Sequence, residues 1–186
     1  MNFPSFEIVA SGKVRNNIYC CLSLSSTQDK VWELSSQGAV SGTLVISREQ
    51  LAGRGRRGRE WLSPAGGLWF SLLIYPVSPA EAGKLTLHAA RCLALAVESA
   101  SGIKPRVKLP NDLYYRNRKL AGIILELRDG RAVLGVGLNV NNPTGGFPGT
   151  VPAVGLREIT GRHLSRSAIL KSFLSYFEPA LPRRFC

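Results

Sequence analysis

Two apolar runs separated by a tight turn constrain the fold of this chain more than any other feature. Leu120–Leu127 and Ala132–Leu138 flank the dipeptide Asp129-Gly130. Asp-Gly between two strand-like runs is a strong signal for a hairpin, because a tight two-residue turn requires positive φ values that Asp and Gly tolerate. A further apolar run at Leu68–Tyr75 has the length and composition of a buried strand. The sequence therefore predicts a sheet with antiparallel pairing.

Helical patterns surround these strands. The segment Ser26–Asp29 is typical of a helix start, because a Ser hydroxyl and an acidic side chain three residues later can satisfy free backbone N–H groups, and Gly38 is expected to end this helix. Four more elements are expected: helices at 84–99 and 167–177, and short strands at 43–47 and 106–109. Strands joined by both hairpins and helices predict an α+β fold, with helices flanking a mainly antiparallel sheet.

Composition narrows the class of protein. A chain of 186 residues with 45% hydrophobic residues fits one globular domain, residues 1–186, with a sizeable core. The four cysteines lack the spacing of zinc ligands and no secretory signal pattern is present, which favours a reduced, cytoplasmic protein. No apolar run approaches the roughly 18 residues of a membrane helix. His88 and His163 lie far from every motif described below, so a histidine-based catalytic centre is not expected.

The positive charge of the chain is concentrated. The formal net charge is +12, and arginines and lysines gather at 54–59 and 116–119. Such a surface attracts nucleotides, nucleic acids or acidic proteins. The first cluster, Gly53–Arg59, interleaves glycines, which allow close approach to a ligand, with arginines, which hold phosphates and carboxylates; Trp61 follows. Alone, this run is more typical of a solvated basic loop or a single-strand nucleic-acid binder. Its position between two strands favours a loop that closes over an anionic ligand.

Three other segments are weak signals when each is taken alone. Pro110–Leu113 contains an Asn-Asp pair that is often only a turn. Lys119 stands at the mouth of an apolar strand with Gly122 three residues on, so it is either an ordinary edge lysine or an ammonium placed beside a ligand along the strand. Gly135–Asn139 contains small residues, which suggest that something approaches this strand closely.

Taken together and in this order, these segments resemble the biotin protein ligase family. The matching segments are Ser26-Thr27, Gln50–Trp61, 110–113, Lys119–Glu126 and Gly135–Asn139, within roughly residues 22–178. The resemblance implies the catalytic-domain fold shared with lipoate ligases and akin to class II aminoacyl-tRNA synthetases. It also implies a reaction with ATP and Mg²⁺. Biotin is activated as biotinyl-AMP with release of pyrophosphate, and a lysine of a biotin carboxyl carrier protein then takes the biotinyl group.

The resemblance implies a role for each matched residue. Lys119 should contact both the biotin carboxylate and the α-phosphate, and Arg54 and Arg56 should hold the phosphate and the loop, so these three are the expected catalytic residues. The expected biotin-binding residues are Ser26, Thr27, Gln50, Gly53, Arg54, Lys119 and Gly122. The expected nucleotide-binding residues are Arg56, Arg57, Trp61, Asn111, Lys119 and Asn139, with Asp112 as an oxygen ligand for Mg²⁺.

The chain also departs from the family pattern. Leu109 stands where the family usually has Trp, which is expected to alter a wall of the acyl pocket. Neither the N-terminal helix-turn-helix domain of some members nor the small C-terminal β-barrel of bacterial members is expected, so DNA binding is not expected, nor is a membrane partner. The expected partner is the carrier protein of acetyl-CoA carboxylase or a related biotin enzyme, and a homodimer is left open. The alternatives are a ligase for another acid, such as lipoate, and a non-catalytic biotin- or nucleotide-binding homologue.

Overall fold

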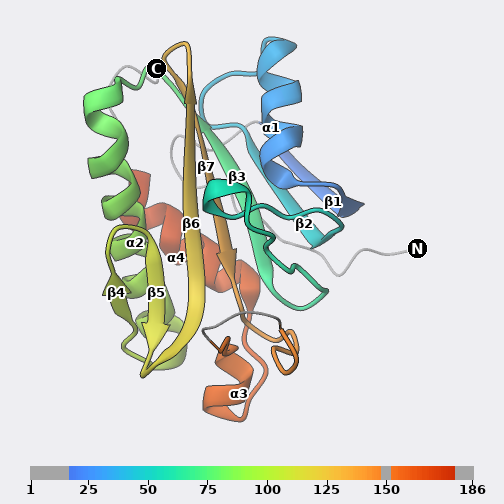
Figure 1. Cartoon of the computed structure of the whole chain (residues 1–186), viewed down its shortest axis with the longest axis vertical. Helices are drawn as coiled ribbons and strands as arrows, with labels where there is room; N and C mark the ends of the chain where they lie inside the picture. Colours follow the sequence, from blue (N-terminus) through green and yellow to red (C-terminus); the bar gives the residue numbers. More distant parts are fainter. Residues whose placement is uncertain (1–16, 148–151, 179–186) are drawn as a thin grey trace.

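A seven-stranded sheet forms the centre of the computed structural model, which describes residues 17–147 and 152–178 (Figure 1). The strands are β1 (Ile18–Leu24), β2 (Leu44–Gln50), β3 (Leu68–Ile74), β4 (Arg106–Lys108), β5 (Asp112–Tyr115), β6 (Arg118–Arg128) and β7 (Arg131–Leu138). Their spatial order is β1-β2-β3-β7-β6-β5-β4. β1 and β2 are parallel, and every other neighbouring pair is antiparallel. The predicted α+β fold with a mainly antiparallel sheet is confirmed.

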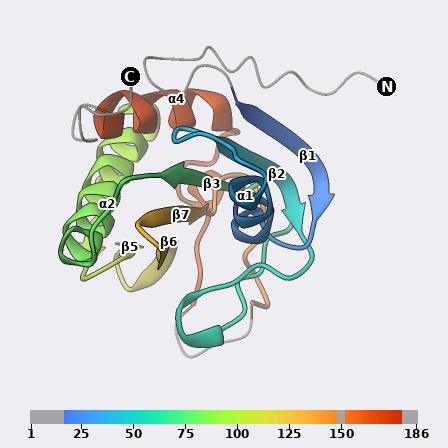
Figure 2. The same cartoon turned by 90° about the horizontal axis from the view of Figure 1, so that it is seen from above.

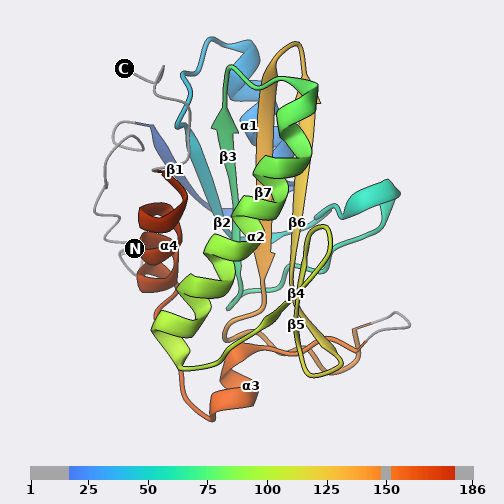
Figure 3. The ribbon, with the colours of Figure 1, turned by 90° about the vertical axis from the view of Figure 1, so that its left-hand side faces the viewer.

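Helices cover the two faces of the sheet unequally. They are α1 (Thr27–Ser36), α2 (Pro79–Ser101), α3 (Leu156–Thr160) and α4 (Arg166–Phe177), with a 3₁₀ turn, η1, at Arg56–Gly58. Figure 3 shows α2 and α4 in front of the sheet and α1 behind it, and Figure 2 shows the same layers from above. One face is therefore covered by two long helices, whereas the other is covered only in part.

Alternation along the strands assigns side chains to these two faces. Ile46, Phe70 and Leu134 belong to the large core under α2 and α4. Leu73 and Val133 point to the opposite face of the same strands and belong to the small core under α1. Residues two apart on a strand share a face. Further along β3 and β7, the α1 face carries small residues at Ser71, Gly135 and Gly137. Where α1 does not cover this face of the sheet, the small side chains therefore leave space for other groups above the strands.

The hairpin predicted from Asp129-Gly130 is confirmed. β6 and β7 pair from Ala121↔Leu138 to Arg128↔Arg131. Asp129 and Gly130 take φ values of 47° and 73°, which are the positive values that this turn requires. The longest antiparallel pairing of the sheet is thus set by a turn of two residues.

The helix predictions are correct in place but not in every boundary. Ser26 is the N-cap of α1, and its hydroxyl accepts the Gln28 N–H at 3.2 Å, but the helix ends at Ser36, before Gly38. α2 begins at Pro79 and not near residue 84, because Ser78 and Glu81 form a capping box ahead of the apolar stripe. Apolar spacing marks only the buried part of a helix, so an exposed first turn escapes it.

Three elements lie outside the sequence predictions. β1 is an edge strand that is exposed at several positions and lacks apolar alternation. β5 begins at Asp112, so the segment that was predicted as a turn continues directly into a strand. α3 has five residues, which is too short for helical periodicity to be visible.

Candidate functional site

A cleft of about 620 Å³ opens on the uncovered part of the α1 face. It lies between the start of α1, the strands β3, β7, β6 and β5, and the arginine loop, which we define as residues 51–67 between β2 and β3. The predicted site residues that line this cleft are Ser26, Thr27, Gln50, Arg54, Arg56, Arg57, Trp61, Asn111, Asp112, Lys119, Gly122 and Asn139. Segments far apart in the sequence therefore meet in one site.

Two residues singled out from the sequence are not part of the cleft wall. Gly53 lies behind the wall, where a Cβ atom would come within 2.4 Å of the Trp61 carbonyl oxygen and 2.7 Å of Ser63 Oγ. Its role is therefore to let two backbone segments approach each other. Leu109 is 70% exposed and does not line the cleft, so the expectation that it alters a wall of the pocket is wrong for this structure.

A cluster of uncharged polar groups lies where α1 begins. The side-chain carbonyl of Gln50 accepts the Thr27 N–H at 2.8 Å and the Thr27 hydroxyl at 3.0 Å. The Thr27 hydroxyl also lies 2.7 Å from Ser71 Oγ, and Gln50 Nε2 donates to Ser63 Oγ at 2.7 Å. These bonds hold the hydroxyl and amide groups in fixed orientations, so the cluster is suited to a ligand that offers both donors and acceptors.

Gln28 belongs to the same wall and was not identified from the sequence. Its Nε2 donates to the Val133 carbonyl at 3.3 Å. Its Oε1 is buried and has no hydrogen-bond partner within residues 17–147 and 152–178. Gly135 makes room for it, since a Cβ atom at that position would lie 2.6 Å from Oε1. A buried acceptor without a partner is costly, so Gln28 Oε1 is suited to accept a hydrogen bond from a ligand.

The indole of Trp61 lies on the glycine floor of the cleft. A Cβ atom at Gly137 would be 2.3 Å from Trp61 Nε1, and one at Gly122 would be 3.1 Å from the indole ring. Trp69 meets Trp61 edge-on, with ring centroids 6.5 Å apart. Trp61 Nε1 is buried without a partner in the described chain. Small residues at these two strand positions therefore give the indole its place, which explains the glycines in the Gly135–Asn139 segment.

The arginine loop folds back on itself as a small hairpin. Gly55 N–H donates to the Arg59 carbonyl at 2.7 Å, and Trp61 N–H donates to the Gly53 carbonyl at 2.8 Å. Between these two hydrogen bonds, the backbone of Arg54 pairs with that of Glu60 in an antiparallel β-bridge. The turn of this hairpin is η1, where Arg57 has a φ of 58°. The basic segment that was predicted as a long loop is therefore a structured arm that carries its arginines beside the cleft.

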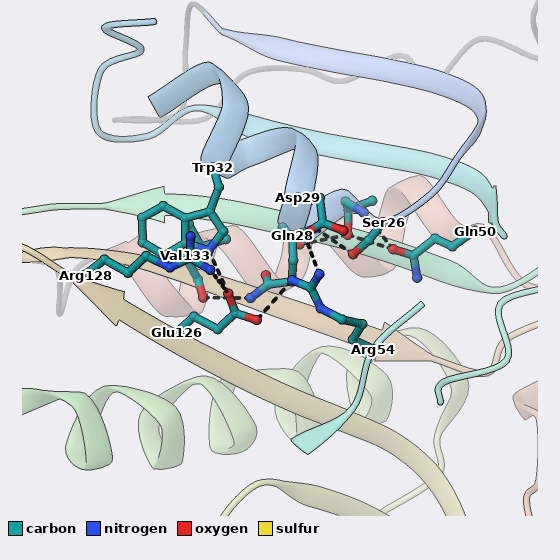
Figure 4. A network of polar contacts seen from close by, with 11 residues as sticks. Ser26, Gln28, Asp29, Trp32, Gln50, Arg54, Glu126, Arg128 and Val133 are labelled. Carbon is teal, nitrogen blue, oxygen red and sulfur yellow. Dashed lines mark hydrogen bonds and ion pairs between the residues drawn. The ribbon is translucent and has the colours of Figure 1, made fainter. Parts of the chain in front are cut away.

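Arg54 and Arg56 have different surroundings. Figure 4 shows Arg54 with its partners Asp29 and Glu126. Arg54 forms ion pairs with Asp29 of α1 and Glu126 of β6. Burial alone would lower the pKa of the Arg54 guanidinium, but the hydrogen bond and charge of Asp29 and the charge of Glu126 raise it above its ordinary value. Arg56 instead donates to the neutral side chain of Asn111, at 2.7 Å. Arg56 thus keeps its charge available to an anion more fully than Arg54 does.

Lys119 is held in the cleft through both its side chain and its backbone. Its Nζ lies 3.0 Å from Asp112 Oδ2 and 5.2 Å from the centroid of the Trp61 ring. Its backbone N–H donates to the Pro152 carbonyl at 2.8 Å, and its carbonyl accepts the Val154 N–H at 2.9 Å. Contacts on both sides of the backbone, together with the ion pair, fix the position of the ammonium group.

A β-bulge brings Lys119 to the cleft face. Positions three apart on a regular strand point to opposite faces, yet Lys119 and Gly122 both line the cleft. The register shifts between Leu113 and Tyr114 of β5, so that Leu113 pairs with Ala121 while Tyr114 pairs with Lys119. Leu120 is the extra residue on β6. A bulge of this kind re-aims the side chains beyond it, as observed beside many active sites.

Asp112 was expected to bind Mg²⁺. Its surroundings fit an ion that takes most of its coordinating oxygens from a bound nucleotide and water and only one carboxylate from the protein. One carboxylate oxygen pairs with Lys119, and the other, Oδ1, is buried without a partner within the described residues. The same part of the chain contains no group of three or more His, Cys, Asp or Glu residues that could hold a metal ion. Mg²⁺ commonly uses one or two carboxylates and takes its other ligands from phosphates and water. Asp112 as a metal ligand stays a prediction.

The remaining titratable groups noted in the sequence lie away from the cleft. His88 stacks on Phe177 with ring centroids 5.5 Å apart, and its Nε2 is 3.3 Å from Cys92 Sγ, in the layer of α2 and α4. Burial raises the pKa of the Cys92 thiol to about 11, so the thiol stays protonated at neutral pH. Within the described residues, no helix combines the length and apolar character needed to cross a membrane.

Comparison with known proteins places this cleft in a family. Residues 20–141 match the biotin/lipoate A/B protein ligase family. The chain is 37% identical over 164 residues to the bifunctional ligase/repressor BirA of Bacillus subtilis, and the aligned segment covers 83% of this chain and 50% of that protein. It is 37% identical over 157 residues to the biotin–[acetyl-CoA-carboxylase] ligase of Paracoccus denitrificans, which covers 78% of this chain and 64% of that protein. The chain thus spans about half the length of the BirA relative that it matches.

A solved structure agrees with this assignment. The biotin protein ligase from Aquifex aeolicus, in complex with biotin and ATP, superposes with a TM-score of 0.78 at 32% sequence identity. The alignment covers 88% of this chain and 69% of that one. The similarity therefore extends over nearly all of the described fold.

Proposed function

Because the chain belongs to the biotin/lipoate A/B protein ligase family, we propose that its cleft activates biotin with ATP. The biotin carboxylate attacks the α-phosphate, the bond to the β-phosphate oxygen breaks, and biotinyl-AMP and pyrophosphate form. The amine of a carrier lysine then attacks the mixed anhydride, so that an amide forms and AMP leaves. The observation that carries this proposal is that one cleft contains both a fixed cluster of uncharged polar groups and the cations Lys119 and Arg56.

The polar cluster favours biotin over lipoate. The ureido ring of biotin offers two N–H groups and a carbonyl, whereas the dithiolane ring of lipoate offers no comparable hydrogen-bonding groups. Thr27 and Gln50 supply a hydroxyl and an amide, and Gln28 Oε1 is a buried acceptor without a partner in the described residues. A site with buried polar groups rejects a ligand that would leave them unpaired. Ser26 acts mainly as the helix cap that positions Thr27 and Gln28.

The cations address the main barrier of the first step. Both reactants are anions, and negative charge builds up at phosphorus, so cations that are already in place lower the barrier without reorganisation. Lys119 is assigned to the carboxylate and α-phosphate, with Asp112 as its anchor. Arg56, held by Asn111, and the neighbouring Arg57 are assigned to the phosphates. Mg²⁺, bound with ATP and reached by Asp112, would supply charge neutralisation at the β- and γ-phosphates.

The nucleoside is assigned to the part of the cleft at Trp61 and Asn139. An indole offers a flat face on which a base can stack. Asn139 is 1% exposed, and its Oδ1 accepts a hydrogen bond from Asn142 Nδ2 at 3.0 Å, which fixes its side chain. Gly122, beneath the indole, lets Trp61 lie close to the backbone of β6.

The acceptor in the second step is proposed to be a lysine of a biotin carboxyl carrier protein. The net charge of +12 is suited to attract an acidic carrier, and salt should weaken that attraction. We expect the reaction in the cytoplasm, where ATP is abundant. There thiols stay reduced, and the three cysteines in the described residues are free.

The decisive experiment is ATP–pyrophosphate exchange. The purified chain with Mg²⁺ is expected to move labelled pyrophosphate into ATP only when biotin is present, because the exchange runs through reversible adenylate formation. Lipoate in place of biotin serves as the control and is expected to give little exchange. A folded sample that binds neither biotin nor ATP in calorimetry would contradict the proposal and favour a non-catalytic homologue, whereas exchange with lipoate alone would assign the chain to a different acyl substrate.

A further inference from the structure

Two carboxylates, Asp29 of α1 and Glu126 of β6, pair with the guanidinium of Arg54 (Figure 4). We infer that Glu126 and Asp29 are positioning residues, which hold Arg54 and thereby fix the base of the arginine loop against the biotin part of the cleft. This inference rests on the proposed function. Of the two tasks that the family resemblance implied for Arg54, holding the phosphate and holding the loop, it assigns the second and names the residues through which Arg54 performs it.

The direct contacts leave the guanidinium between two carboxylates. Arg54 Nη1 pairs with Asp29 Oδ1, and Arg54 Nη2 lies 3.3 Å from Glu126 Oε1. Asp29 belongs to the first turn of α1, next to the cleft-lining Thr27 and Gln28. Two negative charges thus face one positive charge. A phosphate that approached Arg54 would meet two carboxylates, whereas Lys119 faces one and Arg56 donates to the neutral Asn111, so Lys119 and Arg56 are the better phosphate ligands.

Glu126 is itself held from other directions. Its Oε2 accepts the Trp32 indole N–H at 2.7 Å and an Arg128 N–H at 3.4 Å. The Arg128 guanidinium lies 4.4 Å from the centroid of the Trp32 ring, which closes the network. The Glu126 side chain is only 22% exposed. A carboxylate that is bound by three donors and partly shielded from water is a rigid anchor, unlike a lone surface partner.

The position of the anchor explains its effect on the loop. Glu126 shares the cleft face of β6 with Gly122, and β5 pairs with β6 only as far as Gly122. Within residues 17–147 and 152–178, the backbone of β6 therefore has no neighbouring strand at Glu126 on the side of β5. The backbone of Arg54 pairs with that of Glu60 across the small hairpin, as in an antiparallel strand pair, and the carbonyl of its neighbour Gly53 accepts the Trp61 N–H. Holding Arg54 therefore holds the strand of the loop that carries Trp61 and the turn behind Gln50.

The test is Glu126→Gln in the full chain, with Glu98→Gln as the matched control. Glu98 belongs to α2, pairs with Lys104 beyond the end of that helix at 3.2 Å, and does not line the cleft. In the free protein, Glu126→Gln is expected to speed amide hydrogen exchange in residues 51–66 several-fold, because the loop opens more often. It should raise the KM for biotin roughly tenfold and leave the KM for ATP within about twofold, because the biotin wall loses its fixed position. Glu98→Gln should change none of these quantities.

Arg54 variants separate positioning from phosphate binding. Arg54→Ala should reproduce the effects of Glu126→Gln, and the double variant should be little worse than either single variant, since both remove one connected unit. Arg54→Lys should recover part of the loop protection. If Glu126→Gln lowers the yield of folded protein, Asp29→Asn provides the same test, because Asp29 is an exposed residue of the first turn of α1. Unchanged loop exchange in these variants would overturn the inference, as would an Arg54→Ala effect confined to the KM for ATP.

Failure of this inference can be distinguished from failure of the proposed function. Loop exchange is measured on the free protein and needs no substrate. A parent chain that does not bind biotin would contradict the proposed function, while faster loop exchange in Glu126→Gln would still support the anchor.

Discussion

Replacing Lys119 with alanine is expected to lower the rate of biotinyl-AMP formation by about 10²–10³-fold, the usual loss when one fixed group that stabilises developing charge is removed. The ammonium is held by Asp112 at 3.0 Å, and the lysine backbone is bonded to residues 152 and 154. Removing it takes away a cation whose position was already fixed. Rapid-quench measurement of adenylate in a single turnover tests this, because it isolates the first step from transfer to the carrier.

Two comparison variants make this result interpretable. Lys104→Ala removes a lysine that is 82% exposed and does not line the cleft, and it should leave the rate unchanged. Lys119→Ala also leaves the Asp112 carboxylate without its partner, so thermal unfolding must show that the fold persists. A folded Lys119→Ala protein that forms adenylate at the parent rate would show that the assigned role is wrong.

Replacing Gly137 with valine is expected to weaken the binding of a non-hydrolysable biotinyl-AMP analogue by about tenfold to a hundredfold. A Cβ atom at this position would lie 2.3 Å from Trp61 Nε1, so the indole must leave the floor of the cleft. A stacked base contributes about 1–3 kcal/mol, which sets the size of the expected loss. Valine suits the interior of a strand, so the fold should persist. Calorimetry gives the affinity, and tryptophan fluorescence should report a more exposed indole.

The matched control is another glycine. Gly83 lies inside α2, and a Cβ atom there would meet nothing within 4 Å. Gly83→Ala should stabilise the protein by about 0.5–1 kcal/mol, as alanine is a better helix former than glycine, and leave the affinity for the analogue unchanged. Unaltered affinity in Gly137→Val would mean that binding of the adenosine part of the analogue does not depend on the position of the Trp61 indole.

Local patterns in the sequence predicted the parts of the fold that depend on neighbouring residues. The Asp129-Gly130 turn and the cap at Ser26 are recognisable because the chemistry that forms them lies within a few residues. The matched segments are weak signals when each is taken alone; their order, which resembles the biotin protein ligase family, predicted a common site, and they meet in one cleft. The exposed edge strand β1 and the short helix α3 have no such signal, because their place comes from contacts with distant parts of the chain.

The candidate site was predicted less completely than the fold. Gln28 was overlooked because its role depends on the space above Gly135, more than a hundred residues away. Glu126 looked like the end of an apolar strand, and only the folded chain shows that Arg54 and Trp32 both reach it. Long-range pairing of this kind has no periodicity to detect, so a single sequence indicates which residues matter more readily than which residues touch.

The bulge at Leu120 determines the direction of a charge. Lys119 and Gly122 are three positions apart and share the cleft face only because the strand bulges between them. Straightening the bulge without changing the number of residues would restore strict alternation and turn the ammonium toward the apolar layer under α2, where its charge would be buried. Deleting Leu120 would instead leave Lys119 two positions from Gly122, still on the cleft face of a regular strand. The direction of the ammonium thus depends on the conformation of the backbone at Leu120 and not on the number of residues alone.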